Sequence, residues 1–148
     1  MRARAEVAVF VTRTGDGAVL LLHRSPEHGG YWHVVAGGVE PGETVADAAE
    51  RELREETGLV AEVGAGIDVV EYVDPRTKEA AAPPSQHDTE VVAIAVTCFL
   101  VSAPAGWEPA LDWEHDRHRW CPAEEAYAML RWPGTAQALR KLLTPDRR

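Results

Sequence analysis

The sequence of 148 residues predicts an α/β fold, a three-layer α/β/α sandwich built around a mixed β-sheet. Three observations favour this class. Valine-rich stretches with the pattern of strands occur near the start of the chain and again past its middle. One helical segment separates these stretches, and two further helical segments end the chain. Strands interrupted by a central helix, with helices at the end, are typical of a mixed sheet covered on both faces.

The first expected elements form a β-hairpin. Residues 5–13 alternate in polarity and are rich in valine, which indicates a strand. An Asp-Gly pair then marks a turn, and residues 18–24 are the returning strand. Residues 25–30 contain Pro, Gly and His and are expected to form a loop, after which residues 31–35 are extended.

A helix is expected over residues 45–57. Thr44 is a candidate N-cap, and Asp47 three residues later gives a capping-box arrangement with Asp in place of Glu. Alanines, Leu53 and the charged residues between them favour helix. Gly58 supplies a left-handed stop, after which the chain becomes extended.

Strands and two helices are expected after this central helix. The remaining expected elements are strands at 59–63, 67–73, 89–102 and 118–120, a helix from Pro122 to about Leu130, and a helix at 135–143. Residues 74–88, rich in alanine and proline, are the least structured segment. Two interpretations of that segment stay open: it closes over a substrate, or it is disordered.

Three carboxylates share one face of the expected central helix. Glu52, Glu55 and Glu56 fall within an arc of roughly 100° at about 100° per residue. Like charges at this spacing cost about 0.2–0.5 kcal/mol per pair on an exposed helix. Arg51 relieves Glu55 but not all three acids. A hard divalent cation, Mg²⁺ with Mn²⁺ as a substitute, resolves the repulsion and leaves room for a phosphate. The alternative is a solvated helix surface.

The acidic helix belongs to a longer pattern that covers residues 37–59. The pattern is Gly, five residues, Glu, seven residues, then Arg-Glu-aliphatic-x-Glu-Glu-x-Gly-aliphatic. Its fixed positions are filled by Gly37, Glu43, Arg51, Glu52, Leu53, Glu55, Glu56, Gly58 and Leu59. In this pattern the chain resembles the Nudix hydrolases. The resemblance extends over nearly the whole chain, and the length is that of one domain, residues 1–148.

The resemblance implies an α/β/α sandwich in which the pattern forms a strand, a loop and a helix. It implies that Glu52, Glu55 and Glu56 bind the metal ion, with the carbonyl of Gly37 as a further ligand. Arg51 is expected to orient the carboxylates of the helix as part of the catalytic machinery. Glu43 is expected to bind metal through water or to fix the loop, close to the substrate. Either Glu52 or Glu114 deprotonates the attacking water, and the sequence does not choose between them.

The implied reaction is hydrolysis of the pyrophosphate linkage in a nucleoside diphosphate joined to another group X. The favoured substrate is a nucleoside triphosphate or close analogue, which yields a monophosphate and pyrophosphate. Residues 114–126, EHDRHRWCPAEEA, resemble enzymes that act on nucleoside triphosphates, dihydroneopterin triphosphate or diadenosine tetraphosphate. Alternative substrates are dinucleoside polyphosphates and nucleotide sugars. A non-catalytic nucleotide sensor is a further alternative, which the intact acidic pattern argues against.

Five residues outside the pattern are candidates for the site, most of them with a structural alternative. Arg24, at the end of a strand, binds a phosphate or forms a surface ion pair. Trp32 stacks on a base or pterin ring, or packs, whereas His33 is expected to face the pocket. Glu114 is by resemblance a metal ligand or general base, or else an exposed loop residue. His115 polarises a phosphate or caps the site, or is a surface or packing histidine.

Composition excludes several other classes. The net charge of −9 argues against a nucleic-acid polymer as partner, because general binders of the phosphate backbone are basic. Cys98 and Cys121 lack metal-ligand spacing and are expected to stay reduced. No secretory signal and no membrane-spanning apolar run is apparent, so no membrane partner is expected and the cytoplasm is the expected compartment. The family resemblance leaves a homodimer open.

Overall fold

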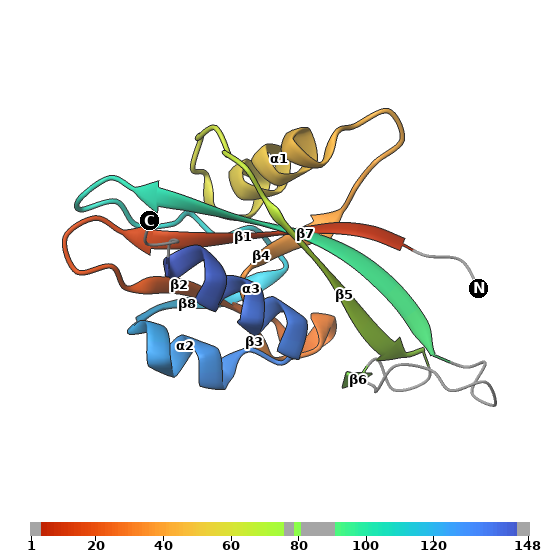
Figure 1. The fold of residues 1–148 in the computed structure, drawn as a ribbon. Coiled ribbons are helices and arrows are strands. Elements are labelled where there is room, and N and C mark those ends of the chain that lie inside the picture. The colour runs from red at the N-terminus through yellow and green to blue at the C-terminus, as the bar shows by residue number, and fades with distance from the viewer. Residues whose placement is uncertain (1–3, 76–78, 81–90, 145–148) are drawn as a thin grey trace.

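The computed structural model describes residues 4–75, 79–80 and 91–144, in which eight strands form one mixed sheet flanked by helices (Figure 1). The strands are β1 (Arg4–Arg13), β2 (Val19–Arg24), β3 (Trp32–His33), β4 (Val35–Gly38), β5 (Ile67–Asp74), β6 (Glu79–Ala80), β7 (Val92–Ala103) and β8 (His115–Cys121). The helices are α1 (Val45–Thr57), α2 (Ala123–Met129) and α3 (Pro133–Leu143), with a short 3₁₀ helix η1 at Pro26–His28.

The sheet is built around β1. Its main path runs β3-β2-β1-β7-β5-β6, while β4 pairs with β1 and β8 pairs with β2. The β1–β7 pair is parallel, and every other pair is antiparallel. Helix α1 covers one face of the sheet, and α2 and α3 cover the other (Figure 1). The predicted α/β/α sandwich around a mixed sheet is therefore confirmed.

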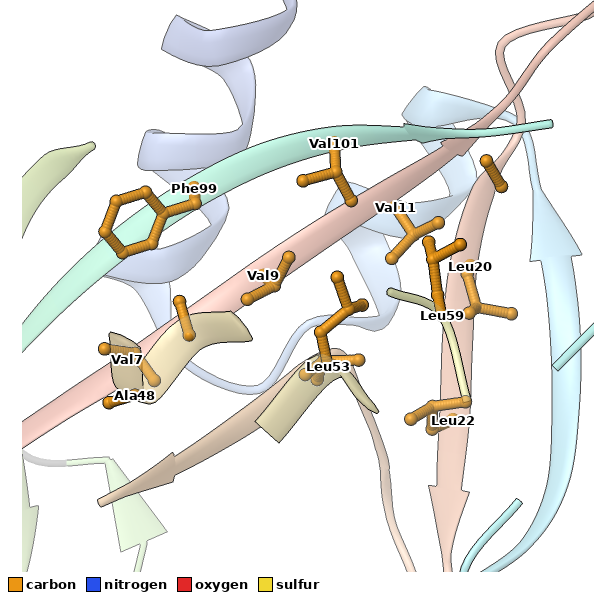
Figure 2. Packing of buried hydrophobic residues seen from close by; sticks show 13 residues of the cluster. Val7, Val9, Val11, Leu20, Leu22, Ala48, Leu53, Leu59, Phe99 and Val101 are labelled. Atoms are coloured by element: carbon orange, nitrogen blue, oxygen red, sulfur yellow. The ribbon is translucent and has the colours of Figure 1, made fainter. Parts of the chain in front are cut away.

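Alternate residues of β1 pack against the helices on opposite faces of the sheet, because successive side chains of a strand point to opposite faces. Val7 and Val9 pack with Leu53 of α1, and Figure 2 shows this cluster from close by. Ala8 and Phe10 lie in the second cluster, which contains residues of α2 and α3. Burial of Leu53, whose exposure is 0%, contributes about 1.5–3 kcal/mol and fixes α1 on the sheet.

Helix α1 has the bounds that the sequence predicts. The hydroxyl of Thr44 accepts a hydrogen bond from the backbone N–H of Asp47 at 3.0 Å, so the predicted N-cap is confirmed. Gly58 ends the helix in the left-handed region, with φ of 81°. The capping signals are local in sequence, which is why they locate this helix without tertiary information.

The prediction of a strand at 59–63 is wrong, because that segment has no regular structure. Its backbone donors pair with side chains of α1 instead of a neighbouring strand. The N–H of Leu59 donates to Thr57 Oγ1 at 3.1 Å, and the N–H of Val63 donates to the Glu50 carboxylate at 3.0 Å. Leu59 is buried in the core beside α1, so the segment is an irregular strap along the helix.

Elements near the C-terminus differ from prediction mainly in their bounds. Strand β8 begins three residues before the expected 118, because it pairs along the length of β2. Pro122 has an extended backbone and is the N-cap of α2, one position before the expected place. Helix α3 begins at Pro133, since proline is well tolerated in a first helical turn.

The segment at 74–88 lies largely outside the described residues. Asp74 ends β5, and Glu79–Ala80 forms β6 against it. The two interpretations of residues 76–78 and 81–88 therefore stay predictions. Strand β7 begins at Val92, and the expected residues 89–90 are also outside the described part.

Both cysteines are buried and free, as predicted. Burial raises the pKa of the Cys98 thiol to about 12, which keeps it protonated at neutral pH. Among the described residues, no helix combines the length and apolarity that crossing a membrane requires.

Candidate active site

A cavity of about 980 Å³ lies where β4, α1, β5 and the start of α3 approach one another. This volume is at the upper end of the range of small-molecule sites and accommodates a nucleotide. One wall carries Gly37, Glu52 and Glu56, and another carries Trp132 and Thr135. Segments distant in sequence, which also include β1, β2 and β7, therefore build one cavity.

The acidic wall depends on a close approach between α1 and β4. An added Cβ at Gly37 would lie 2.3 Å from the carboxyl carbon of Glu52, so a larger residue there would force this carboxylate to move. Glu56 is buried, and its Oε1 accepts from the backbone N–H of Ala36 at 3.4 Å. Burial, together with a hydrogen bond that the protonated carboxyl donates to Glu52, raises the pKa of Glu56 far above its usual range. Glu56 therefore favours its protonated form when no cation is bound.

Arg51 joins the loop before α1 to the helix. Its guanidinium forms a two-pronged contact with Glu43, at 2.7 and 3.0 Å, and donates to the carbonyl of Gly38 at 3.0 Å. This pairing holds the pKa of Glu43 at about 2. Arg51 also contacts Glu52 at 2.5 Å and Glu55 at 3.3 Å. Glu43 thus lies on Arg51 and fixes the loop, one of its two expected roles.

The three helix carboxylates do not occupy equivalent places. Glu52 and Glu56 line the cavity, whereas the side chain of Glu55 is 53% exposed beside Arg51 and does not line it. Within the described ranges, no three His, Cys, Asp or Glu side chains converge in the manner of a finished metal site. The structure therefore brings together Gly37, Glu52 and Glu56 of the expected ligand set.

His115 lies behind the acidic wall. Its side chain is almost wholly buried and does not line the cavity. Its Nδ1 is 2.7 Å from Asp112 Oδ1, and its Nε2 is 3.8 Å from Glu56 Oε1. Sequence reasoning missed Asp112, although the spacing of three residues from a histidine was visible. Of the interpretations of His115, a packed histidine matches this position.

Glu114 and Arg24 meet at the cavity because β8 pairs with β2. Arg24 Nη2 lies 3.5 Å from Glu114 Oε2, and Arg24 Nε donates to the carbonyl of His28 at 2.8 Å. The N–H of Ser25 donates to the Glu114 carbonyl at 2.9 Å, which ties the two segments together. Both candidates are thus beside the space that a substrate would fill.

The alternation of β3 separates Trp32 from its neighbours. Tyr31 and His33 line the cavity, and Trp32 does not. Trp32 packs edge-on against His23, with ring centroids 5.0 Å apart. The guanidinium carbon of Arg117 lies over the Trp32 ring, 5.5 Å from its centroid. The expectation that His33 faces the pocket agrees with this geometry, whereas Trp32 has the position of a packing residue.

The wall formed by the start of α3 was missed by sequence reasoning. Glu71 of β5 is buried and accepts from Gly134 N, Thr135 N and Thr135 Oγ1, at 3.2, 2.7 and 2.8 Å. The N-cap position, Trp132, has no capping side chain, so a carboxylate from another element satisfies these donors. The signal in the sequence that could have indicated this wall is the lack of a capping residue at the start of α3.

Comparison with known protein families identifies one family over nearly the whole chain. The sequence profile of the NUDIX domain matches residues 2–142. The octanoyltransferase of Myxococcus xanthus is 33% identical over 135 residues, which is 91% of this chain but only 35% of that protein. The CTP pyrophosphohydrolase of Escherichia coli (strain K12) is 33% identical over 122 residues, 81% of this chain and 76% of that protein.

A solved structure gives the same answer for the fold. The E. coli dihydroneopterin triphosphate pyrophosphohydrolase superimposes with a TM-score of 0.70 at 22% identity, covering 92% of this chain and 92% of that one. At this identity the likeness concerns the fold alone. It agrees with the sandwich described above.

Proposed function

This chain is a member of the Nudix hydrolase family, and we propose that it hydrolyses the pyrophosphate linkage of a nucleoside diphosphate joined to a further group. The favoured substrate is a nucleoside triphosphate, which would yield a monophosphate and pyrophosphate. The observation that carries the proposal is the placement of Glu52 and Glu56 beside Gly37 at the wall of a cavity of about 980 Å³. The similarity to a CTP pyrophosphohydrolase supports the choice of substrate class.

Mg²⁺ is the proposed cofactor, with Mn²⁺ as a substitute. The donors are all oxygens, as hard divalent cations prefer: the carboxylates of Glu52 and Glu56, the carbonyl of Gly37, and Glu55 as the remaining acid of the pattern. Glu52 and Glu56 would hold the cation, whose positive charge would take the place of the proton on Glu56. When bound, it would polarise the phosphoryl group and neutralise the leaving pyrophosphate.

The proposed chemical step is attack of water on a phosphorus atom, with cleavage of the P–O–P link. Glu52 or Glu114 takes the proton from the water, since both line the cavity. Arg24, beside Glu114, offers a charged fork of donors to a substrate phosphate. Arg51 holds Glu52 and the preceding loop in place and is proposed to orient the acids.

The variant Glu56→Gln tests the proposal, because it keeps the shape of the side chain but removes a metal-binding charge. We expect kcat at saturating Mg²⁺ to fall on the order of 100-fold or more. The melting temperature should be unchanged or higher, since the raised pKa makes an ionised Glu56 unfavourable in the fold.

Glu62→Gln, at an exposed position outside the cavity, is the matched control and should retain turnover. Turnover like that of the wild type in Glu56→Gln would contradict the proposal.

A hydrolysis screen, in which the products are separated by ion-exchange chromatography, tests the substrate class. It should include nucleoside triphosphates, dinucleoside polyphosphates, ADP-ribose and dihydroneopterin triphosphate, and we expect the highest kcat/KM for a nucleoside triphosphate. Faster hydrolysis of another compound in the screen would change the assigned substrate class but not the proposed pyrophosphate hydrolysis. Tight nucleotide binding without hydrolysis, in Mg²⁺ or Mn²⁺, would instead indicate a sensor.

A further inference from the structure

His33 carries a buried polar atom without a partner. Its Nδ1 is the single buried side-chain nitrogen or oxygen that lacks a hydrogen bond among the residues that the structure describes. The residue is only 9% exposed, and it lines the cavity. Buried polar groups in folded proteins are nearly always hydrogen-bonded, so an exception beside a cavity calls for a functional explanation.

The imidazole of His33 is neutral at the pH of the cell. Burial, followed by the positive charge of Arg24, lowers its pKa to about 4. A neutral imidazole offers one donor and one acceptor. It suits an uncharged polar edge better than a phosphate, for which the same cavity provides Arg24.

Flat side chains lie on the same cavity. Tyr31 and Trp132 both line it, and the guanidinium of Arg131 lies 4.5 Å from the centroid of the Tyr31 ring and 5.6 Å from that of Trp132. The Tyr31 and His33 rings are 6.2 Å apart. Aromatic rings and guanidinium planes are the surfaces on which nucleic-acid bases stack in proteins.

We propose that His33 recognises the heterocyclic base of the substrate, whose polar edge pairs with the imidazole while its ring lies beside Tyr31, Arg131 and Trp132. The inference rests on the proposed function, because it assumes a nucleotide substrate. It divides the cavity into two parts: Glu52, Glu56 and Gly37 face the phosphates, and His33 faces the base. His33 is thus a specificity-determining residue rather than one that takes part in bond cleavage.

The test compares His33→Leu with the wild type on ligands with and without a base. For His33→Leu we expect KM for the preferred nucleoside triphosphate, and the inhibition constant of its monophosphate, to rise about five- to tenfold, the effect of one lost hydrogen bond. The inhibition constant of inorganic tripolyphosphate and kcat should hardly change. His33→Asn, which keeps a polar nitrogen near the Nδ1 position, should recover part of the affinity and alter the preference among bases.

His118→Leu is the matched control, because His118 lies on β8, pairs with Glu108 and does not line the cavity. It should leave every constant unchanged. The inference is overturned if tripolyphosphate and the monophosphate weaken equally in His33→Leu, or if this variant only lowers the melting temperature and leaves KM unchanged. Failure of the wild type to hydrolyse any nucleotide would defeat the proposed function instead. Calorimetry with the monophosphate would then still decide whether His33 binds a base.

Discussion

At the scale of single residues, the buried acid Glu56 is stabilised by neighbours that sequence reasoning did not identify. The backbone N–H of Ala36 donates to it, and the Nε2 of His115 lies 3.8 Å from its Oε1. His115 is in turn oriented by Asp112 through a contact of 2.7 Å. Residues behind a metal-binding group commonly control its orientation, so Asp112 should influence turnover without touching the substrate.

Replacing Asp112 tests this arrangement. Asp112→Ala leaves Nδ1 of His115 buried without a partner, so the free energy of unfolding should fall by about 1–3 kcal/mol. A reoriented His115 would no longer support Glu56, and kcat should fall about tenfold while KM changes little. Steady-state kinetics and urea unfolding measure the two effects.

Asp112→Asn is the informative companion to this variant, because it keeps an acceptor for His115. It should recover most of the lost stability and turnover. If Asp112→Ala turned over substrate as fast as the wild type, the pair would have only a packing role.

At the scale of elements, the site depends on how closely β4 passes α1. Gly37 lies against the carboxyl of Glu52, and Arg51 bonds the carbonyl of the next residue. The loop between them is held by Glu43 on the same guanidinium. The strand, loop and helix therefore form one unit, in which the absence of a side chain at Gly37 allows β4 to lie close to α1.

Gly37→Ala should disrupt this unit. The new methyl would lie 2.3 Å from the carboxyl carbon of Glu52, so Glu52 must move away from the cavity wall. We expect kcat to fall by about tenfold or more, with a smaller loss of stability because the carboxylate can swing aside.

Gly38→Ala is the adjacent control, since an added Cβ there meets no atom within 4 Å. Hydrolysis assays of both variants compare their kcat values. Equal effects of the two substitutions would show that the contact with Glu52 is unimportant.

The elements differ in how well sequence predicts them, for physical reasons. Helix α1 was predictable to the residue because its cap, its stop and its acidic pattern are all local. The segment 59–63 was not, because its backbone donors pair with the side chains of Thr57 and Glu50. The extent of β8 is set by its partner β2, which no local pattern reveals.

The same distinction applies to the site. The acids of the Nudix pattern were identifiable from spacing alone, and the candidates Arg24, Glu114 and His33 line the cavity. Glu71 and Trp132 were missed, because only tertiary packing brings α3 to the cavity. Local signals thus locate the phosphate chemistry, whereas the proposed base site required the fold.

At the scale of the whole molecule, burial of His33 couples the cavity to the stability of the fold. Burial lowers its pKa from 6.5 to about 4. Protonation of this imidazole is therefore less favourable in the folded protein than in the unfolded chain. Between these two values the unfolded state binds more protons. The free energy of unfolding should therefore fall as the pH drops from 6.5 through 4, and the contribution of His33 is fully present above pH 6.5.

His33→Leu should remove this part of the pH dependence. Between pH 7 and pH 4, the wild type should lose up to about 3 kcal/mol more than the variant, the linkage value for such a shift. Urea unfolding at both pH values measures the difference, in which the contributions of all other groups cancel. If the stability curves of His33→Leu and the wild type ran parallel across this range, His33 would titrate freely, and the environment that makes it a neutral recognition group would not exist.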